Sequence, residues 1–350
     1  MSPSLAPAEA SSYRRFRLVV VALSIVAAIV GSVLLATHRS SKKVSGQAGS
    51  TLAATLPPGG KVVAQIRVGR GGLPDRGGGA LAVGEGAVWA MSDTRSMLMR
   101  IDPARNAIVA KIKVARPDTA AAGDGAVWLS YPSDDTVIRI DPATNKVTAT
   151  IDVGPQPQGI AVTRGAVWIA NAGGPSVSRI DPATNRVVAT IPVGLKRACC
   201  AEHTNVIASP RAVWVAVPYG NRLVRIDPAT NRVVAKAVLD YEPCGYLAAD
   251  RTGAVWSAAC DADVVGRVDA RTNEPTAGVP EVQPEGLEVA FGSVWVAASG
   301  SGNVDRIDPR TGRLVASLHV SGLIVRIGAA FGSIWVNDDF GRVLRIKPQR

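Results

Sequence analysis

The sequence predicts an all-β protein, a β-propeller of seven four-stranded blades, and two observations carry this prediction. Seven tryptophans recur at intervals of 39, 40, 46, 42, 39 and 40 residues, and a β-rich period near forty is typical of propeller blades. Six of the seven also follow Gly-Ala-Val, Gly-Ser-Val or Gly-Ser-Ile. The repeated tryptophans are Trp89, Trp128, Trp168, Trp214, Trp256, Trp295 and Trp335. Their common position predicts core residues rather than a ligand cage.

The third repeat shows how one blade is divided into strands. The predicted strands are Gly159–Thr163, Ala166–Asn171, Ser176–Asp181 and Arg186–Val193. They are rich in Val, Ile and Thr, and turn residues separate them. Apolar residues occupy both faces, which suits a sheet packed between two neighbours.

The turn after the third strand carries a conformational signal. Its fifth position is Asn in five repeats, as at Asn185, and Gly312 in the sixth. Asn and Gly are the residues that tolerate a left-handed backbone. We therefore expect a positive φ at this position in every blade that has the turn.

The two ends of the chain predict how the ring closes. The last repeat has only three strands, at Ile327–Ala330, Ile334–Asn337 and Arg342–Ile346. Before the first repeat stands one extra strand, Val62–Val68, whose sequence matches the fourth strand of other repeats. We expect this N-terminal strand to complete the last blade and to cover its open edge.

These motifs resemble those of known propellers. The run VVATIPVG at Val187–Gly194, beside V-x-R-I-D-P, resembles the YVTN-type seven-bladed propellers. The V-W-x-A segments are similar to the virginiamycin B lyase-like propellers. The resemblance covers about residues 61–350. It implies the fold, whereas propellers of this kind host unrelated activities.

The N-terminal part predicts a membrane anchor. Leu18–Ala36 is nineteen residues without a charge, and a helix of that length spans ~28 Å, enough to cross a bilayer core. We divide the chain into a disordered cytoplasmic tail (1–17), a signal-anchor helix (18–37), a flexible linker (38–60) and the propeller (61–350). The propeller would then lie outside the cytoplasm, or be secreted if the segment is cleaved.

The basic charge of the chain does not indicate nucleic-acid binding. The net charge is +11, and residues 1–60, with six Lys or Arg and one acid, supply +5 of it. Most of the rest belongs to an arginine repeated on the third strands, and Arg179 and Asp181 share a strand face on which they are expected to pair. Aromatic residues are only 5% and are mostly the blade tryptophans, so a base-stacking platform is absent.

All four cysteines are predicted on one rim of the propeller. The long loop Gly194–Thr204 carries Cys199 and Cys200, the loop before the fifth blade carries Cys244, and Cys260 ends a second strand. In an exported protein they indicate two disulfides, with three possible pairings. We favour Cys244 with Cys260, which leaves either a strained vicinal Cys199–Cys200 bridge or one of these two cysteines free or cross-paired. A single bridge from the long loop to Cys244 is the rival pairing. A metal or redox site is a minor alternative, because no CxxC motif exists.

The same rim is rich in acidic residues. Asp240, Asp261, Asp263 and Glu281 belong to it, and the default interpretation is a solvated acidic face. The sharper hypothesis is a site for a ligand, or for a divalent cation such as Mg or Ca, at the mouth of the channel. Its candidate residues are Glu202, His203, Tyr241, Glu242, Glu285 and Glu288. His319, on an outer strand, is expected at the surface.

We expect binding rather than catalysis. No catalytic motif stands out, and an anchored, monomeric propeller with a variable rim suits a sensing module for a protein, peptide or cell-envelope ligand. The alternative comes from the resemblance, which implies a cation-dependent enzyme, either a C–O lyase or a lactonase. His203 is the candidate histidine for that chemistry, although no lyase catalytic pair can be matched residue by residue.

Overall fold

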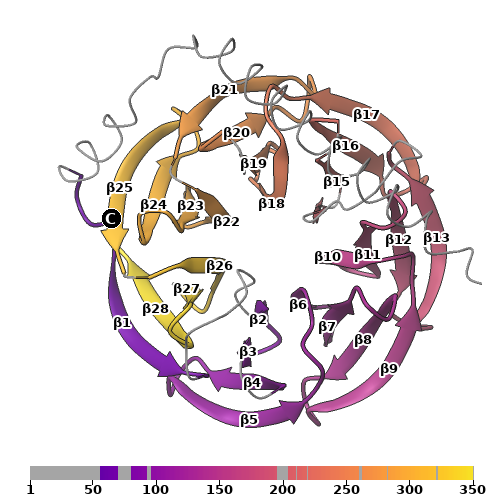
Figure 1. The fold of residues 1–350 in the computed structure, drawn as a ribbon, viewed down its shortest axis with the longest axis horizontal. Helices are drawn as coiled ribbons and strands as arrows, with labels where there is room; N and C mark the ends of the chain where they lie inside the picture. Colours follow the sequence, from indigo (N-terminus) through magenta and orange to yellow (C-terminus); the bar gives the residue numbers. More distant parts are fainter. Residues whose placement is uncertain are drawn as a thin grey trace, which may run out of the picture. The chain divides into compact units, whose positions relative to one another are not determined.

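The computed structural model describes residues 56–69, 80–92, 96–194 and 204–349, apart from positions 210, 219, 260, 261, 282 and 321. In these ranges, twenty-eight strands form seven four-stranded antiparallel sheets. The sheets stand in a ring, each with one strand near the centre and one at the outside (Figure 1). This confirms the seven-bladed all-β propeller. No helix long and apolar enough to cross a membrane occurs in the described ranges, and the predicted anchor at 18–37 lies outside them.

The first four blades follow one another along the chain, each listed from the innermost strand outward. Blade 1 contains β2 (Leu81–Gly84), β3 (Ala87–Ser92), β4 (Met97–Asp102) and β5 (Ala107–Lys113). Blade 2 contains β6 (Ala120–Gly123), β7 (Ala126–Tyr131), β8 (Thr136–Asp141) and β9 (Lys146–Asp152). Blade 3 contains β10 (Pro157–Thr163), β11 (Ala166–Asn171), β12 (Ser176–Asp181) and β13 (Arg186–Pro192). Blade 4 contains β14 (Val206–Ser209), β15 (Ala212–Val217), β16 (Arg222–Asp227) and β17 (Arg232–Val238).

The last three blades have the same order of strands. Blade 5 contains β18 (Pro243–Ala249), β19 (Val255–Ala259), β20 (Val264–Val268) and β21 (Pro275–Pro280). Blade 6 contains β22 (Pro284–Ala290), β23 (Ser293–Ala298), β24 (Asn303–Asp308) and β25 (Arg313–His319). Blade 7 contains β26 (Ile324–Ala330), β27 (Ser333–Asp338), β28 (Arg342–Pro348) and, as its outermost strand, β1 (Gly60–Arg67).

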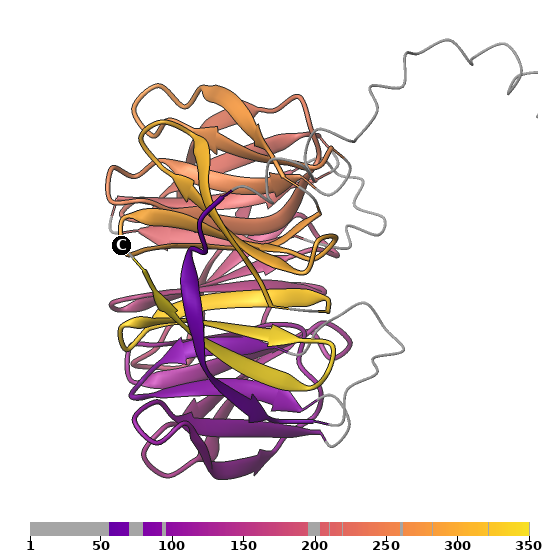
Figure 2. The ribbon, with the colours of Figure 1, turned by 90° about the vertical axis from the view of Figure 1, so that its left-hand side faces the viewer.

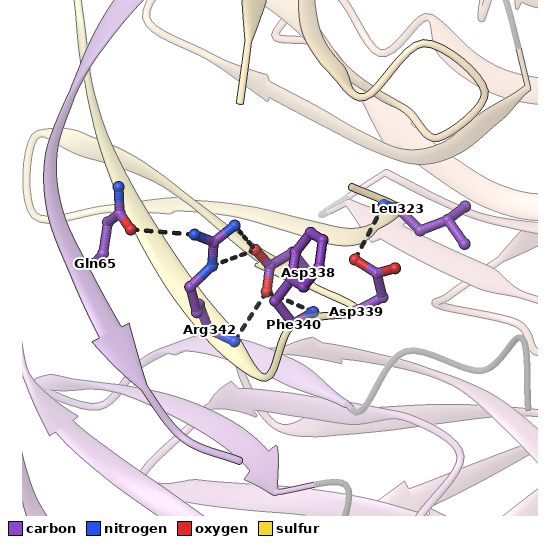
Figure 3. Close-up of polar contacts among 6 residues, drawn as sticks. All are labelled: Gln65, Leu323, Asp338, Asp339, Phe340 and Arg342. Atoms are coloured by element: carbon purple, nitrogen blue, oxygen red, sulfur yellow. Dashed lines mark hydrogen bonds and ion pairs between the residues drawn. The ribbon is translucent and has the colours of Figure 1, made fainter. Parts of the chain in front are cut away.

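The N-terminal strand completes the last blade, as predicted. β1 pairs antiparallel with β28 from Gly60 opposite Pro348 to Arg67 opposite Arg342, and Figure 2 shows the two strands side by side. The guanidinium of Arg342 fastens this junction. It contacts the buried Asp338 carboxylate at 2.6–2.7 Å and donates to Gln65 of β1 at 3.3 Å (Figure 3). The edge of the last blade is thereby covered.

The observed strands match the predicted ones closely, and the differences have a local cause. In blade 3, β11 and β12 have the predicted bounds, whereas β10 begins at Pro157, two residues earlier. Pro157 pairs with Asn171 ahead of an irregularity in the register before Ile160. Such a bulge interrupts the alternating pattern, so the start of the strand is hidden in the sequence.

The predicted left-handed turn position is confirmed in all six blades that have it. The φ values are 51° at Asn106, 58° at Asn145, 54° at Asn185, 56° at Asn231, 61° at Asn273 and 66° at Gly312. In the same turn, the Asp181 carboxylate accepts the backbone N–H of Ala183 at 2.9 Å. This bond is the main reason that the pKa of Asp181 lies below its usual range.

The seven tryptophans are core residues, as predicted. Each is at most 1% exposed, and the guanidinium of the repeated arginine lies over its ring, 5.1–5.8 Å from the centroid. Burial of an aromatic ring together with cation–π contact stabilises each blade.

The repeated arginine does not make the predicted pair with the neighbouring aspartate. Arg179 instead donates to the Pro228 carbonyl at 3.0 Å and to Asn231 Oδ1 at 2.8 Å, both in the turn of the next blade. Asp181 is already occupied by its own turn. The equivalent bond to the turn asparagine is made by Arg100, Arg139, Arg225 and Arg345. The turn asparagine therefore has two roles, a left-handed backbone and a latch between blades.

Candidate functional site

Polar side chains gather where the innermost strands begin, at one end of the ring axis. We call this set of residues the mouth. It consists of Asp118, Gln158, Asn205, Tyr246, Glu285 and Arg326, from blades 2 to 7 in order. Asp118 is exposed and the other five are partly exposed, so solvent reaches each of them. Below the mouth, the innermost strands carry mainly Ala, Val, Ile and Gly.

Three side chains of the mouth form a hydrogen-bonded chain across three blades. Arg326 of β26 donates to the hydroxyl of Tyr246 of β18 at 2.5 Å, and its guanidinium carbon lies 5.0 Å from the centroid of that ring. The Tyr246 hydroxyl also bonds the carboxylate of Glu285 in β22. Burial is the main cause that raises the pKa of Tyr246, so the phenol stays protonated and donates to Glu285.

The mouth carries an excess of negative charge. Burial alone would lower the pKa of Arg326, but Tyr246, Asp118 and Glu285 around it raise the pKa. Asp118 comes from blade 2, so residues of three other blades surround the guanidinium of Arg326. Among the described mouth residues, Arg326 faces two carboxylates, which leaves one negative charge in excess.

A further carboxyl group lies deeper on the same strand as Glu285. Glu288 stands opposite Trp295 in the register of blade 6, and its carboxylate accepts the backbone N–H of Ala329 on β26 as well as that of Val289. Burial raises the pKa of Glu288 to about 7. This group is therefore poised between its charged and neutral forms near neutral pH.

The predicted site residues that the structure describes do not all lie in the mouth. Glu285 and Glu288 both lie on the innermost strand β22, and Glu242 is partly exposed just before β18. Tyr241 is buried, its hydroxyl lies 2.6 Å from Ser257 Oγ, and burial raises its pKa to about 12. Tyr241 fills the space left by Gly266 between blades 4 and 5, so it is a packing residue and not part of the mouth.

The remaining predicted residues cannot be placed. Glu202, His203, Cys199, Cys200 and Cys260 lie outside the described residues. The backbone of Cys244 belongs to β18, but its side chain is outside them too. The disulfide pairing therefore stays a prediction, whereas His319 is exposed at the end of β25, as expected.

Glu281 is not on the acidic rim, where the sequence had placed it. It is 6% exposed and contacts Asp305, which is 3% exposed, between blades 5 and 6. Burial raises the pKa of Asp305, although bonds with Ser317 and Glu281 oppose the shift. Two buried carboxyl groups in contact are stable when one proton lies between them.

The described residues do not fit a divalent cation at the mouth. No group of three or more His, Cys, Asp or Glu in these ranges is arranged to hold a metal ion. The Arg326 guanidinium also lies beside Glu285, where it would repel a metal. We therefore derive no chemistry from Mg or Ca here.

A separate groove runs between blades 4 and 5 on the outer side. Its volume is about 640 Å³, and Val238, Asp240, Tyr241, Val264 and Pro275 contribute to its wall. Val238 is 69% exposed. The wall offers one carboxylate and no converging set of polar groups, so the mouth is the stronger candidate for a specific site.

Sequence reasoning missed Asp118, Tyr246 and Arg326. Asp118 precedes β6 by two residues, whereas Tyr246 and Arg326 lie within the first four residues of β18 and β26. Counted from the residue opposite the blade tryptophan, Asp118, Gln158 and Glu285 lie three residues earlier, and Asn205, Tyr246 and Arg326 lie two residues earlier. The bulges at this point, as between Pro284 and Gly286, conceal their shared place at the mouth.

Comparison with known proteins supports the fold alone. No protein-family model matches the chain, and no curated protein matches it. Among solved structures, virginiamycin B lyase from Staphylococcus aureus is 15% identical, with a TM-score of 0.67 over 82% of this chain and 99% of that chain. A streptogramin B lyase structure is also 15% identical, with a TM-score of 0.67 over 82% of this chain and 98% of that chain. Kuenenia stuttgartiensis hydrazine synthase is 15% identical, with a TM-score of 0.66 over 79% of this chain and 96% of that chain.

The chain is thus a seven-bladed propeller with the fold of virginiamycin B lyase. A lyase and a hydrazine synthase have this fold in common. The fold therefore does not determine the activity, and the site must be argued from its own residues.

Proposed function

We propose that the protein is a membrane-anchored, extracytoplasmic binding or sensing module that takes its ligand at the mouth. The observation that supports this proposal is the convergence of Tyr246, Glu285 and Arg326 from three blades. The uncharged stretch Leu18–Ala36 supports the anchor. The partner would be a protein, a peptide or a component of the cell envelope.

The geometry suits recognition because the polar groups are fixed before a ligand arrives. Arg326 is held by Tyr246 and by its backbone, whose N–H donates to Asn337 Oδ1 at 2.9 Å. Arg326 as a whole residue is partly exposed, and burial is the largest influence on the pKa of its guanidinium. A ligand would therefore meet oriented donors and acceptors above an apolar wall, and pre-organisation of this kind reduces the entropic cost of binding.

The test is ligand-dependent stability of the full-length protein. The panel contains peptides, peptidoglycan fragments, sugars, lactones and divalent cations. A compound that binds only the folded state raises stability by RT ln(1 + [L]/Kd), or about 2.7 kcal/mol at a hundredfold excess over Kd. The expected result is a shift that Arg326→Gln and Glu285→Gln abolish and that Arg310→Gln, a change at an exposed turn residue, leaves intact. A shift of equal size in all variants, or no shift with any compound, would contradict the proposal.

A second candidate is an enzyme of the lyase or lactonase type. Two observations favour it, the fold of the lyase neighbours and Glu288, whose pKa of about 7 suits proton transfer. Turnover of a cyclic depsipeptide or a lactone, lost in Glu288→Gln and in His203→Ala, would support the enzyme. Absence of turnover with both substrate classes would exclude it for them.

A further inference from the structure

On each innermost strand, one residue lies opposite the blade tryptophan, and Glu288 is the only charged residue among these seven. The residues that occupy the same register position, opposite the blade tryptophan, are Ala82, Ala121, Ala161, Ile207, Ala248 and Gly328. All six are apolar, and five are Ala or Gly. Glu288 is partly exposed as a residue, and its carboxylate accepts the backbone N–H groups of Val289 and Ala329. It is thus a single carboxyl group among small apolar side chains.

The charged residues of the mouth favour a cationic ligand. Asp118 and Glu285 outnumber Arg326, which is already bonded to Tyr246. With Glu288 ionised, the described groups carry two negative charges in excess. An anionic ligand would have to displace the contacts of Arg326 and would approach three carboxylates.

The kind of cation follows from the coordination that the site can offer. A divalent metal needs several oxygen ligands close together, and the described residues contain no group of three such side chains. A primary ammonium needs only a carboxylate and carbonyl acceptors for its three donors. An alkyl stem attached to it would lie against the apolar inner strands, as the stem of a lysine does on other apolar surfaces.

Glu285 and Glu288 are three residues apart, which is about 10 Å along a strand. A lysine side chain directed at Glu288 would therefore leave its peptide backbone near the mouth. There Asp118, Gln158 and Glu285 carry oxygen atoms that can accept backbone N–H groups.

We propose that the mouth binds a lysine side chain presented by a peptide or protein, with its ammonium on Glu288 and its stem along the innermost strands. This inference rests on the proposed function and names its ligand class. Glu288 acts as the specificity-determining residue. Arg326, Tyr246 and Glu285 position the peptide around it.

The test is calorimetric titration of the full-length protein with Nα-acetyl-lysine amide at pH 8. The matched probe is Nα-acetyl-norleucine amide, which has a similar stem without the charge. We expect the lysine amide to bind at least tenfold more tightly than the norleucine amide. A charge-assisted hydrogen bond lost in Glu288→Gln corresponds to a loss of roughly tenfold to a hundredfold. Glu274→Gln, at an exposed position on the outer side of blade 5, serves as the control and should bind like the wild type.

A second measurement needs no variant. The charged and titratable groups that face this region are Asp118, Glu285, Arg326 and the hydroxyl of Tyr246. Because the pKa of Glu288 is about 7, the wild type should bind the lysine amide more weakly at pH 6 than at pH 8. The norleucine amide should show no such dependence.

Three results would overturn the inference: equal binding of both amides, unchanged binding in Glu288→Gln, or stabilisation by Mg²⁺ with none by the lysine amide. The proposed function would survive such a failure if other compounds of the panel bound in a manner that depends on Arg326. If no compound bound at the mouth at all, both would fail.

Discussion

The latch between blades, the hydrogen bond between the arginine of one blade and the turn asparagine of the next, predicts that an asparagine in place of Gly312 would stabilise the protein. In five blades the Nη1 of the repeated arginine donates to the turn asparagine of the next blade, but the turn that faces Arg267 of blade 5 has Gly312 in place of the asparagine. Gly312→Asn would supply the missing acceptor. Gly312 has a φ of 66°, which Asn tolerates, and a Cβ added there lies 3.9 Å from Val279, an ordinary contact.

The expected change in the free energy of unfolding combines three contributions: the new hydrogen bond, the backbone strain and the entropy of the unfolded chain. A hydrogen bond to a charged group contributes about 1.5–3 kcal/mol when buried. Since Arg267 is partly exposed, we expect the lower end of that range. The strain of a left-handed non-glycine residue, about 1 kcal/mol, is largely offset by the lower entropy of the unfolded chain, about 0.4–1 kcal/mol. The net expectation is a gain of about 1 kcal/mol in the free energy of unfolding.

The assay is urea denaturation of a double-mutant cycle. Gly312→Asn should raise stability in the wild-type background and have no stabilising effect in Arg267→Ala, because the donor is then gone. Gly312→Ala has the same backbone strain and the same entropic offset but no acceptor, so it should be less stable than Gly312→Asn by the hydrogen-bond contribution, about 1.5 kcal/mol. An equal gain from Gly312→Asn in both backgrounds would refute the latch.

Two further predictions concern buried carboxyl groups. The pKa of Asp305 is raised by burial, so its folded state holds the proton more tightly than the unfolded state. Wild-type stability must then fall as the pH rises above the ordinary aspartate pKa of 3.8 and through the raised folded pKa. Asp305→Asn should make the urea midpoint less dependent on pH above that value, and an unchanged slope would contradict this. Arg342→Ala would leave the Asp338 side chain, which is 0% exposed, buried without its main partner, at a cost of about 3 kcal/mol. The double variant with Asp338→Ala should recover part of that loss in thermal unfolding, and no recovery would show that the loss has another cause.

The repeated elements could be predicted from the sequence because the repeats support one another. The tryptophan and the turn with a positive φ are local signals that recur from blade to blade. The closing strand Val62–Val68 could be predicted because the last repeat lacks a fourth strand. The bond from Arg179 to Asn231 could not be predicted in the same way. Donor and acceptor are fifty-two residues apart, and the nearer Asp181 offered an apparently simpler partner.

The site was predicted only in part, for physical reasons. Glu285 and Glu288 were chosen as candidates because their acidic character departs from the repeat, and their role stays a prediction. Arg326 and Tyr246 were missed because β-bulges shift the starts of the innermost strands. Glu281 and Tyr241 were assigned to the rim since they follow outer strands, whereas the chain there turns inward and packs them against Asp305 and Gly266.

Hydrogen–deuterium exchange of the full-length protein, with and without a compound that stabilises it, tests the central claim most directly. The account predicts slower exchange at the starts of β18, β22 and β26, in residues 243–249, 284–290 and 324–330, and no change in Arg326→Gln. Protection confined to the outer strands or to the groove beside Val238 would place the ligand elsewhere and contradict the account.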